Sequence, residues 1–111
     1  MRLAEVSGSE RVAKDGAKVN DSEPVDYSGL PEHMQDGTKL YIELGTPPGG
    51  FLEAVLCNRL VESFGKADQI NRLAMYAWTT WRWNEAPMGS WGTPEKVDAW
   101  IAKGGLRGNI R

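Results

Sequence analysis

Cysteine and histidine are almost absent from this sequence, which contains one of each. Cys57 has no second cysteine for an internal disulfide, and His33 alone cannot complete a Cys/His zinc cluster. The sequence also lacks an apolar run of about 18 residues that could span a membrane. Its N-terminus lacks the apolar stretch of a signal peptide. We therefore expect a soluble intracellular protein that is held together by packing alone, with no metal site and no cofactor.

An excess of positive charge is missing as well. The 111 residues include 13 Lys and Arg against 15 Asp and Glu, a formal net charge of -2. Nucleic-acid-binding proteins usually carry a basic excess that neutralises phosphates, so we do not expect bulk nucleic-acid binding. The charge is nevertheless uneven, because residues 1–65 are acidic overall and residues 66–111 are basic overall. Such polarity attracts an oppositely charged partner or a second copy of the chain.

Catalytic signatures are also lacking. The Gly-x-Ser-x-Gly motif does not occur. The glycine-rich stretch at residues 45–50 has no Lys-Ser or Lys-Thr after it, and its two prolines remove N–H donors that a phosphate loop would use. We interpret Cys57 as a buried apolar residue. We predict a non-enzymatic protein, and the less favoured alternative is a small hydrolase or transferase that uses Glu32, His33 or Asp36.

Proline and glycine divide the chain from residue 30 onward into helical segments. Prolines stand where helices can begin and glycines stand where they can end. Thr46, Asp68 and Thr93 are the expected N-caps, and Gly37 weakens the first helix by about 1 kcal/mol relative to alanine. The predicted fold class is all-α, a small bundle of about four short helices with an extended N-terminal arm. The expected helices cover residues 31–44, 51–64, 69–86 and 94–103.

Apolar side chains recur at three- and four-residue spacing in each segment, which predicts one buried face per helix. These faces consist of Met34, Thr38, Tyr41 and Leu44; Leu52, Leu56, Leu60 and Phe64; Ile70, Leu73, Ala74, Ala77, Trp78 and Trp81; and Val97, Trp100 and Ile101.

In the first 27 residues Val and Leu occur only as isolated residues, with Gly, Ser, Asn, Asp, Lys and Glu between them. Alone, this segment cannot bury enough surface to offset the entropy lost on ordering. We expect residues 1–27 to form an arm that is flexible, or that orders on the core or on a partner, and residues 28–111 to form the helical domain. Because a domain this small buries a modest share of its surface, we also expect a homo-oligomer.

Tryptophan is the unusual feature of the composition, with all five residues between positions 78 and 100. Trp78 and Trp81 share the predicted buried stripe, whereas Trp83 falls on another face of the same helix. One interpretation is that every indole belongs to the core of a domain that needs bulky side chains. The other is that at least one indole is exposed for recognition.

The second interpretation predicts a binding surface in the third helical segment and the loop after it. Trp, Tyr and Arg are the residue types that dominate binding hot spots. Such a surface would insert into a partner protein, or it would stack on a nucleotide with arginines pairing the phosphates. The predicted binding residues are Arg72, Tyr76, Thr80, Arg82, Trp83, Asn84 and Trp91, with Glu85 adjoining them.

Four short strings between residues 30 and 106 carry a resemblance. They are Pro-Glu-His-Met at 31–34, Pro-Gly-Gly-Phe-Leu at 48–52, Asn-Glu-Ala-Pro at 84–87 and Trp-Gly-Thr-Pro-Glu at 91–95. In these strings the chain resembles a recurring type of short protein, without an assigned activity, that is encoded in the genomes of tailed phages and prophages. The resemblance implies a phage accessory protein in the cytoplasm of a bacterial host, and it carries over no mechanism.

Together these observations predict a non-enzymatic phage accessory protein that binds and occupies a host protein, such as a defence-system protein, through a Trp/Arg surface. The alternative is an oligomeric sponge that sequesters a nucleotide signalling molecule between aromatic and arginine side chains.

Overall fold

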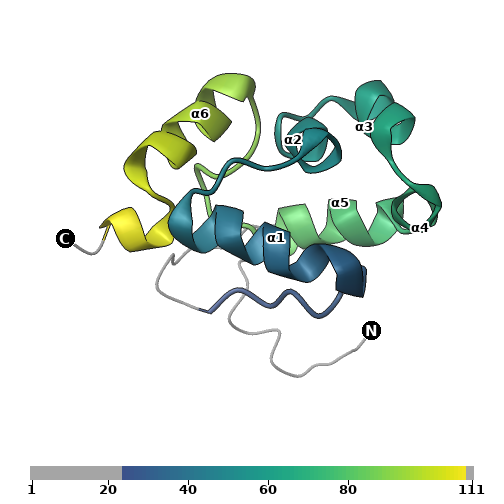
Figure 1. The fold of residues 1–111 in the computed structure, drawn as a ribbon, viewed down its shortest axis with the longest axis horizontal. Helices are drawn as coiled ribbons and strands as arrows, with labels where there is room; N and C mark the ends of the chain where they lie inside the picture. The colour runs from purple at the N-terminus through teal and green to yellow at the C-terminus, as the bar shows by residue number, and fades with distance from the viewer. Residues whose placement is uncertain (1–23, 110–111) are drawn as a thin grey trace.

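Helices are the only regular secondary structure in residues 24–109, the part of the chain that the computed structural model describes. The predicted all-α fold class is confirmed, although within this range six α-helices replace the four expected (Figure 1). Residues 1–23 of the expected arm lie outside the described residues. The elements are α1 (Glu32–Leu44), α2 (Gly50–Leu56), α3 (Leu60–Lys66), α4 (Gln69–Leu73), α5 (Met75–Asn84), α6 (Pro94–Lys103) and the 3-10 helix η2 (Leu106–Asn109).

The first and last predicted α-helices agree with the structure. Helix α1 continues through Gly37 and ends at Gly45, which adopts a left-handed φ of 75°. Helix α6 begins after Thr93, whose side chain accepts a hydrogen bond from the Lys96 amide, and it ends at Gly104 with a φ of 87°. The proline, glycine and cap signals therefore predicted both helices correctly.

The second predicted helix is wrong in its second half, because it breaks at Asn58. Asn58 has a φ of 67°, and its amide and that of Arg59 donate to the carbonyls of Val55 and Ala54. This pair of bonds is a Schellman motif, with asparagine in the left-handed position that glycine more often occupies. Helix α2 also begins at Gly50 without a side-chain cap, so the expected cap at Thr46 is wrong too.

The third predicted helix is broken at Ala74, whose φ and ψ of -101° and 17° separate α4 from α5. The expected cap at Asp68 is confirmed, since its side chain accepts from the Asn71 amide. Asn71 is buried, and its side-chain oxygen accepts a hydrogen bond of 3.1 Å from the Trp78 indole across the break. The continuous helix that periodicity predicts is thus replaced by two helices, and the hydrogen bond between Asn71 and Trp78 joins them across the break.

The two breaks expose apolar residues that the predicted faces placed in the core. Leu60 and Phe64 are 66% and 43% exposed, and Ile70 and Leu73 are 59% and 80% exposed. Leu44 on α1 was also expected inside and is 46% exposed.

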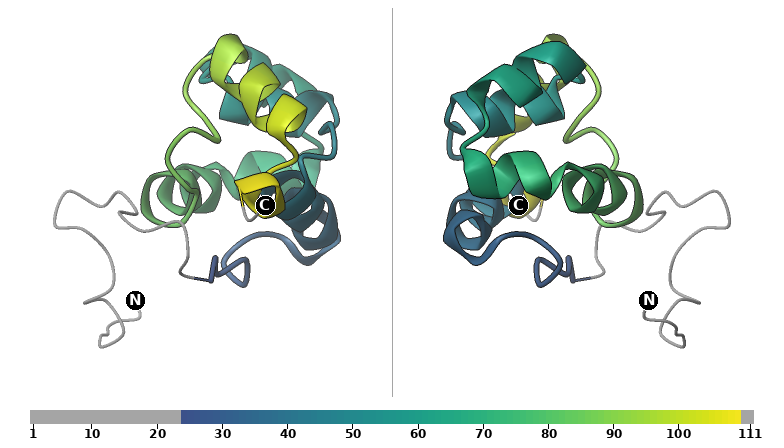
Figure 2. Two further views of the ribbon diagram at one scale, coloured as in Figure 1. Left: turned by 90° about the vertical axis from the view of Figure 1, so that its left-hand side faces the viewer. Right: turned by 90° about the vertical axis from the view of Figure 1, so that its right-hand side faces the viewer.

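The core lies between α2 and α6 on one side and α1 and α5 on the other, as the views in Figures 1 and 2 show. No helix among residues 24–109 has the length and apolar character needed to cross a membrane. The segment before α1 also contributes, because the Tyr27 ring lies 6.1 Å from that of Trp81 and Leu30 is buried. The buried set includes Tyr41, Ile42, Leu52, Val55, Leu56, Cys57, Trp78, Trp81, Val97 and Trp100.

Candidate binding surface on helix α5

The five tryptophans divide into a buried group and an outer pair. Trp78, Trp81 and Trp100 are at most 4% exposed, whereas Trp83 is 47% exposed. Trp91 is half-buried in the loop between α5 and α6. The prediction that at least one indole faces outward is confirmed for Trp83, and the core interpretation holds for the three buried indoles.

Trp83 is supported from the side by Trp91. The two rings meet edge to face, with centroids 6.0 Å apart and an interplanar angle of 66°. The guanidinium carbon of Arg82 lies 4.7 Å from the centre of a Trp91 ring. Edge-to-face pairs contribute about 0.5–1.5 kcal/mol beyond their buried area, and exposed cation–π contacts about 0.5–1 kcal/mol. Trp83 is therefore an exposed ring that is already held in place.

Arg82 faces inward more than the sequence suggested. Its Nη1 donates a 2.8 Å hydrogen bond to the carbonyl of Val55 on α2. Its Nε is buried and makes no hydrogen bond within the described part of the chain. Burial lowers the pKa of the Arg82 guanidinium. Arg82 therefore fastens α5 and Trp91 to α2, and only part of its guanidinium remains for a ligand.

Two hydrogen bonds between the backbone of the Trp91 loop and distant elements hold this loop in place. The Tyr41 hydroxyl donates a buried 2.7 Å hydrogen bond to the Ser90 carbonyl, and the Gly92 amide donates to the Leu56 carbonyl at 2.7 Å. Burial is the main cause of a raised pKa at Tyr41, which stays protonated as a donor. Sequence reasoning missed the role of Tyr41 and Leu56 because no local pattern records contacts between residues this far apart.

We expect Tyr41→Phe to destabilise the fold by about 1–3 kcal/mol, because the buried Ser90 carbonyl loses its donor. The change keeps the ring and removes only the hydroxyl. Chemical denaturation followed by circular dichroism should show this loss. Equal midpoints for Tyr41→Phe and the wild type would contradict this role of the hydroxyl.

Tyr76, Thr80 and Trp83 recur at positions i, i+4 and i+7 of α5, so they form one stripe along the helix. Tyr76 is 84% exposed. The Thr80 hydroxyl donates to the Tyr76 carbonyl at 2.8 Å, so this hydroxyl already has an acceptor within the helix. We define the α5 surface as Tyr76, Thr80, Arg82, Trp83 and Trp91.

The remaining predicted residues lie at the two ends of this surface. Asn84 is the last residue of α5 and is half-buried. Glu85 follows it, and one of its side-chain oxygens accepts a hydrogen bond of 3.1 Å from the Asp26 amide. Arg72 is exposed on α4, before the break at Ala74, so the structure does not place it on the α5 stripe.

Of the candidate acid–base residues Glu32, His33 and Asp36, His33 forms a link between helices. His33 Nε2 lies 2.9 Å from the Asp68 carboxylate, and both side chains are about half exposed. Hydrogen bonds from the Asn71 amide and from His33 lower the pKa of Asp68. The structure thus joins the start of α1 to the start of α4. Within residues 24–109, no three His, Cys, Asp or Glu side chains gather as a metal site would require.

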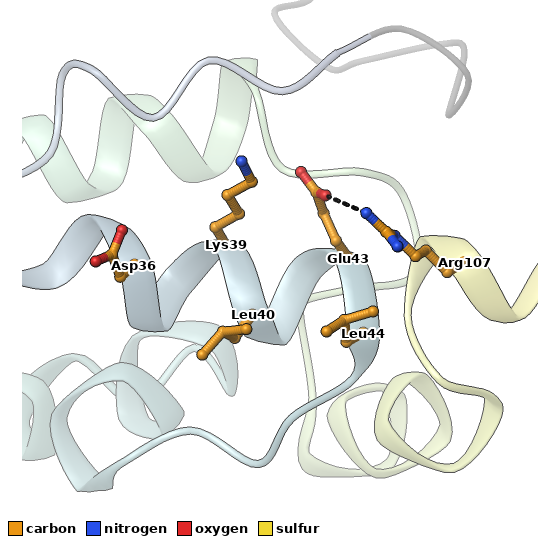
Figure 3. A pocket seen from close by; sticks show the side chains of 6 residues that line it. All are labelled: Asp36, Lys39, Leu40, Glu43, Leu44 and Arg107. Carbon is orange, nitrogen blue, oxygen red and sulfur yellow. Dashed lines mark ion pairs between the residues drawn. The ribbon is translucent and has the colours of Figure 1, made fainter.

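A shallow hollow of about 390 Å³ lies elsewhere, along α1 and η2 (Figure 3). Leu40 and Leu44 form its apolar part, and Glu43 meets Arg107 at 4.0 Å across it. None of the predicted binding residues lines this hollow. Its mixed charges and paired Glu43 give it no arrangement that favours one ligand.

Comparisons with protein-family models, with curated proteins and with solved structures found no match. The function therefore has to be inferred from the residues of this chain.

Proposed function

We propose that the chain is a non-enzymatic phage accessory protein that binds and occupies a host protein, such as a defence-system protein, through the α5 surface. The observation that carries this proposal is Trp83, a large ring that is 47% exposed yet already braced by Trp91. Binding orders side chains at an entropic cost, so a ring held in place before contact loses less on association. Partly exposed, preorganised tryptophans are typical anchors of protein–protein interfaces.

The geometry supports a protein partner better than a nucleotide. Trp83 and Trp91 meet edge to face at 66°, so they do not form the parallel pair that would sandwich a base. Arg82 uses one guanidinium nitrogen on Val55, and Arg72 lies on another helix. A row of exposed side chains along a helix instead matches a groove or patch on another protein.

Site-specific photo-crosslinking in the host tests the proposal. A photoreactive phenylalanine analogue at Tyr76 or Thr80 should give a crosslinked band with one host polypeptide. The same analogue at Asp98, which is exposed on α6, is the matched control and should give no such band. Equal bands from all three positions, or none, would contradict binding through the α5 surface.

Trp83→Ala should abolish the crosslink at Tyr76. We expect its melting temperature to stay within a few degrees of the wild type, because Trp83 is half exposed and lies outside the buried core. Loss of an interface anchor weakens binding by about 30-fold or more, corresponding to about 2 kcal/mol. A large drop in the melting temperature of Trp83→Ala would show instead that Trp83 stabilises the fold. Thermal stabilisation of the wild type by nucleotides that Trp83→Ala removes would favour the nucleotide sponge instead.

A further inference from the structure

The end of the molecule formed by α3 and α4 carries apolar side chains that the fold leaves uncovered. Figure 2 shows both helices toward the viewer in its right-hand panel. Exposed fractions reach 83% at Val61 and 80% at Leu73. We call Leu60, Val61, Phe64, Ile70 and Leu73 the end face.

The apolar residues of α3 occupy one flank of the helix and its charges occupy the other. Leu60, Val61 and Phe64 fall on one side when residues advance by about 100° each. The opposite flank holds Glu62, which lies 2.9 Å from Lys66 and 3.8 Å from Arg59. Glu62 pairs with both cations, so the charged flank of α3 carries one net positive charge and lies on the side of the helix away from the apolar residues.

The Schellman turn at Asn58 is the reason that this flank faces outward. A continuous helix would keep Leu60 and Phe64 on the ridge of Leu52 and Leu56, which are buried. The turn instead redirects α3, and the positive φ of 67° is an uncommon conformation for a residue other than glycine. The fold thus exposes two large apolar side chains that a simple helix would bury.

The end face is large for a small protein. Taken from their exposed fractions, its five residues together present on the order of 600 Å², at the upper end of the roughly 300–600 Å² of the largest patch on a typical monomer. With polar residues at its rim, the end face approaches the roughly 800 Å² that each partner buries in a standard interface.

We propose that the end face is the interface through which two copies of the chain form a symmetric dimer. A two-fold interface places the same patch on both sides, so it must complement itself. An apolar patch meets this condition, since the same exposed aliphatic and aromatic side chains can pack against one another from both copies. A lipid surface fits less well, because membrane-surface helices are longer and rich in Lys and Arg on the polar side, whereas α3 and α4 have seven and five residues.

This dimer leaves the Trp83 end of the α5 surface for the other partner, whereas Tyr76, the second residue of α5, lies beside the junction with α4. Trp83 lies at the far end of α5 from the junction with α4, and the end face does not include it. The dimer would therefore present two copies of Trp83, each braced by its Trp91.

Sedimentation velocity on the full chain from about 1 to 100 µM tests the proposal. The wild type should sediment as a dimer at the upper concentrations. The double variant Val61→Asp/Leu73→Asp should be monomeric, with at least a tenfold weaker dissociation constant, because four carboxylates would face one another. Met88→Asp is the matched control, since Met88 is 64% exposed in a loop outside the end face, and it should dimerise normally.

Circular dichroism shows whether the double variant is folded, and if it is not, the milder Val61→Ser/Leu73→Ser pair takes its place. A monomeric wild type at 100 µM, or a folded double variant that still dimerises, would overturn the proposal. Wild-type monomers that co-sediment with vesicles of phosphatidylcholine and phosphatidylglycerol would assign the end face to lipid. Trp83→Ala should remain dimeric, so failure of the dimer and failure of the α5 surface can be told apart.

Discussion

Trp100→Ala is expected to remove most of the stability of the fold, with a loss of about 3–5 kcal/mol. The Trp100 side chain is 1% exposed, and its indole N–H lies 3.1 Å from the carbonyls of both Tyr41 and Ile42. These carbonyls belong to the last turn of α1, where the Tyr41 carbonyl also accepts from the Gly45 amide and the Ile42 carbonyl has no amide four residues later within the helix. The substitution therefore opens a cavity and also removes a donor from the end of another helix.

Thermal denaturation followed by circular dichroism measures this loss. A domain of this size shifts by roughly 4–8 °C per kcal/mol, so the melting temperature should fall by about 15 °C or more. Trp100→Phe is the matched control, because it keeps a six-membered aromatic ring but loses the five-membered ring with its N–H donor, and its melting temperature should fall between those of the wild type and Trp100→Ala. A melting temperature for Trp100→Ala within about 5 °C of the wild type would refute the role of Trp100 as the link between α6 and α1.

The link at Trp100 also reaches the α5 surface. Tyr41 lies in the same turn of α1, and its hydroxyl holds the loop with Trp91 through Ser90. Trp91 in turn supports Trp83. The exposed ring on α5 thus depends on a chain of contacts that starts at the junction of α1 and α6, which explains why a small fold can present a rigid aromatic side chain.

The sequence predicts those parts of the fold whose signals are local. Thr93 and Asp68 are recognisable as caps because each side-chain oxygen accepts a hydrogen bond from the free amide three residues later. This contact involves no other element of the fold. The end of α1 at Gly45 is equally local, since only glycine adopts its φ without strain. Asn58 is the local signal that was missed, because asparagine is the next most common residue at that position of a Schellman motif.

The break at Ala74 and the bracing of Trp83 depend on distant residues and could not be predicted in the same way. Helical spacing placed Trp83 outward correctly, because α5 is unbroken from Met75 to Asn84. Spacing says nothing of Arg82, whose acceptor Val55 lies 27 residues away. It also assigned Arg72 to the same surface as Trp83, whereas Arg72 lies on α4, before the break at Ala74.

Gly105→Ala is the second substitution with a large expected effect, because Gly45 and Gly105 bring two helix ends into backbone contact. A Cβ atom at Gly105 would lie 2.6 Å from the Gly45 nitrogen and 2.7 Å from the Ile42 oxygen. Both are main-chain atoms, so no side chain can move aside. Gly105 also has a φ of 70°, which costs roughly 1–2 kcal/mol for an L-residue, and overpacking adds about 1–3 kcal/mol.

We therefore expect Gly105→Ala to lower the free energy of unfolding by about 2–5 kcal/mol in urea denaturation. Gly37→Ala, on the exposed side of α1 with nothing within 4 Å of its added Cβ, is the matched control. It should instead stabilise the fold by about 0.5–1 kcal/mol, since alanine favours a helix interior over glycine. The opposite signs separate a close approach of two backbones from a general intolerance of added methyl groups. If Gly105→Ala were as stable as Gly37→Ala, the ends of α1 and α6 would not meet at these glycines.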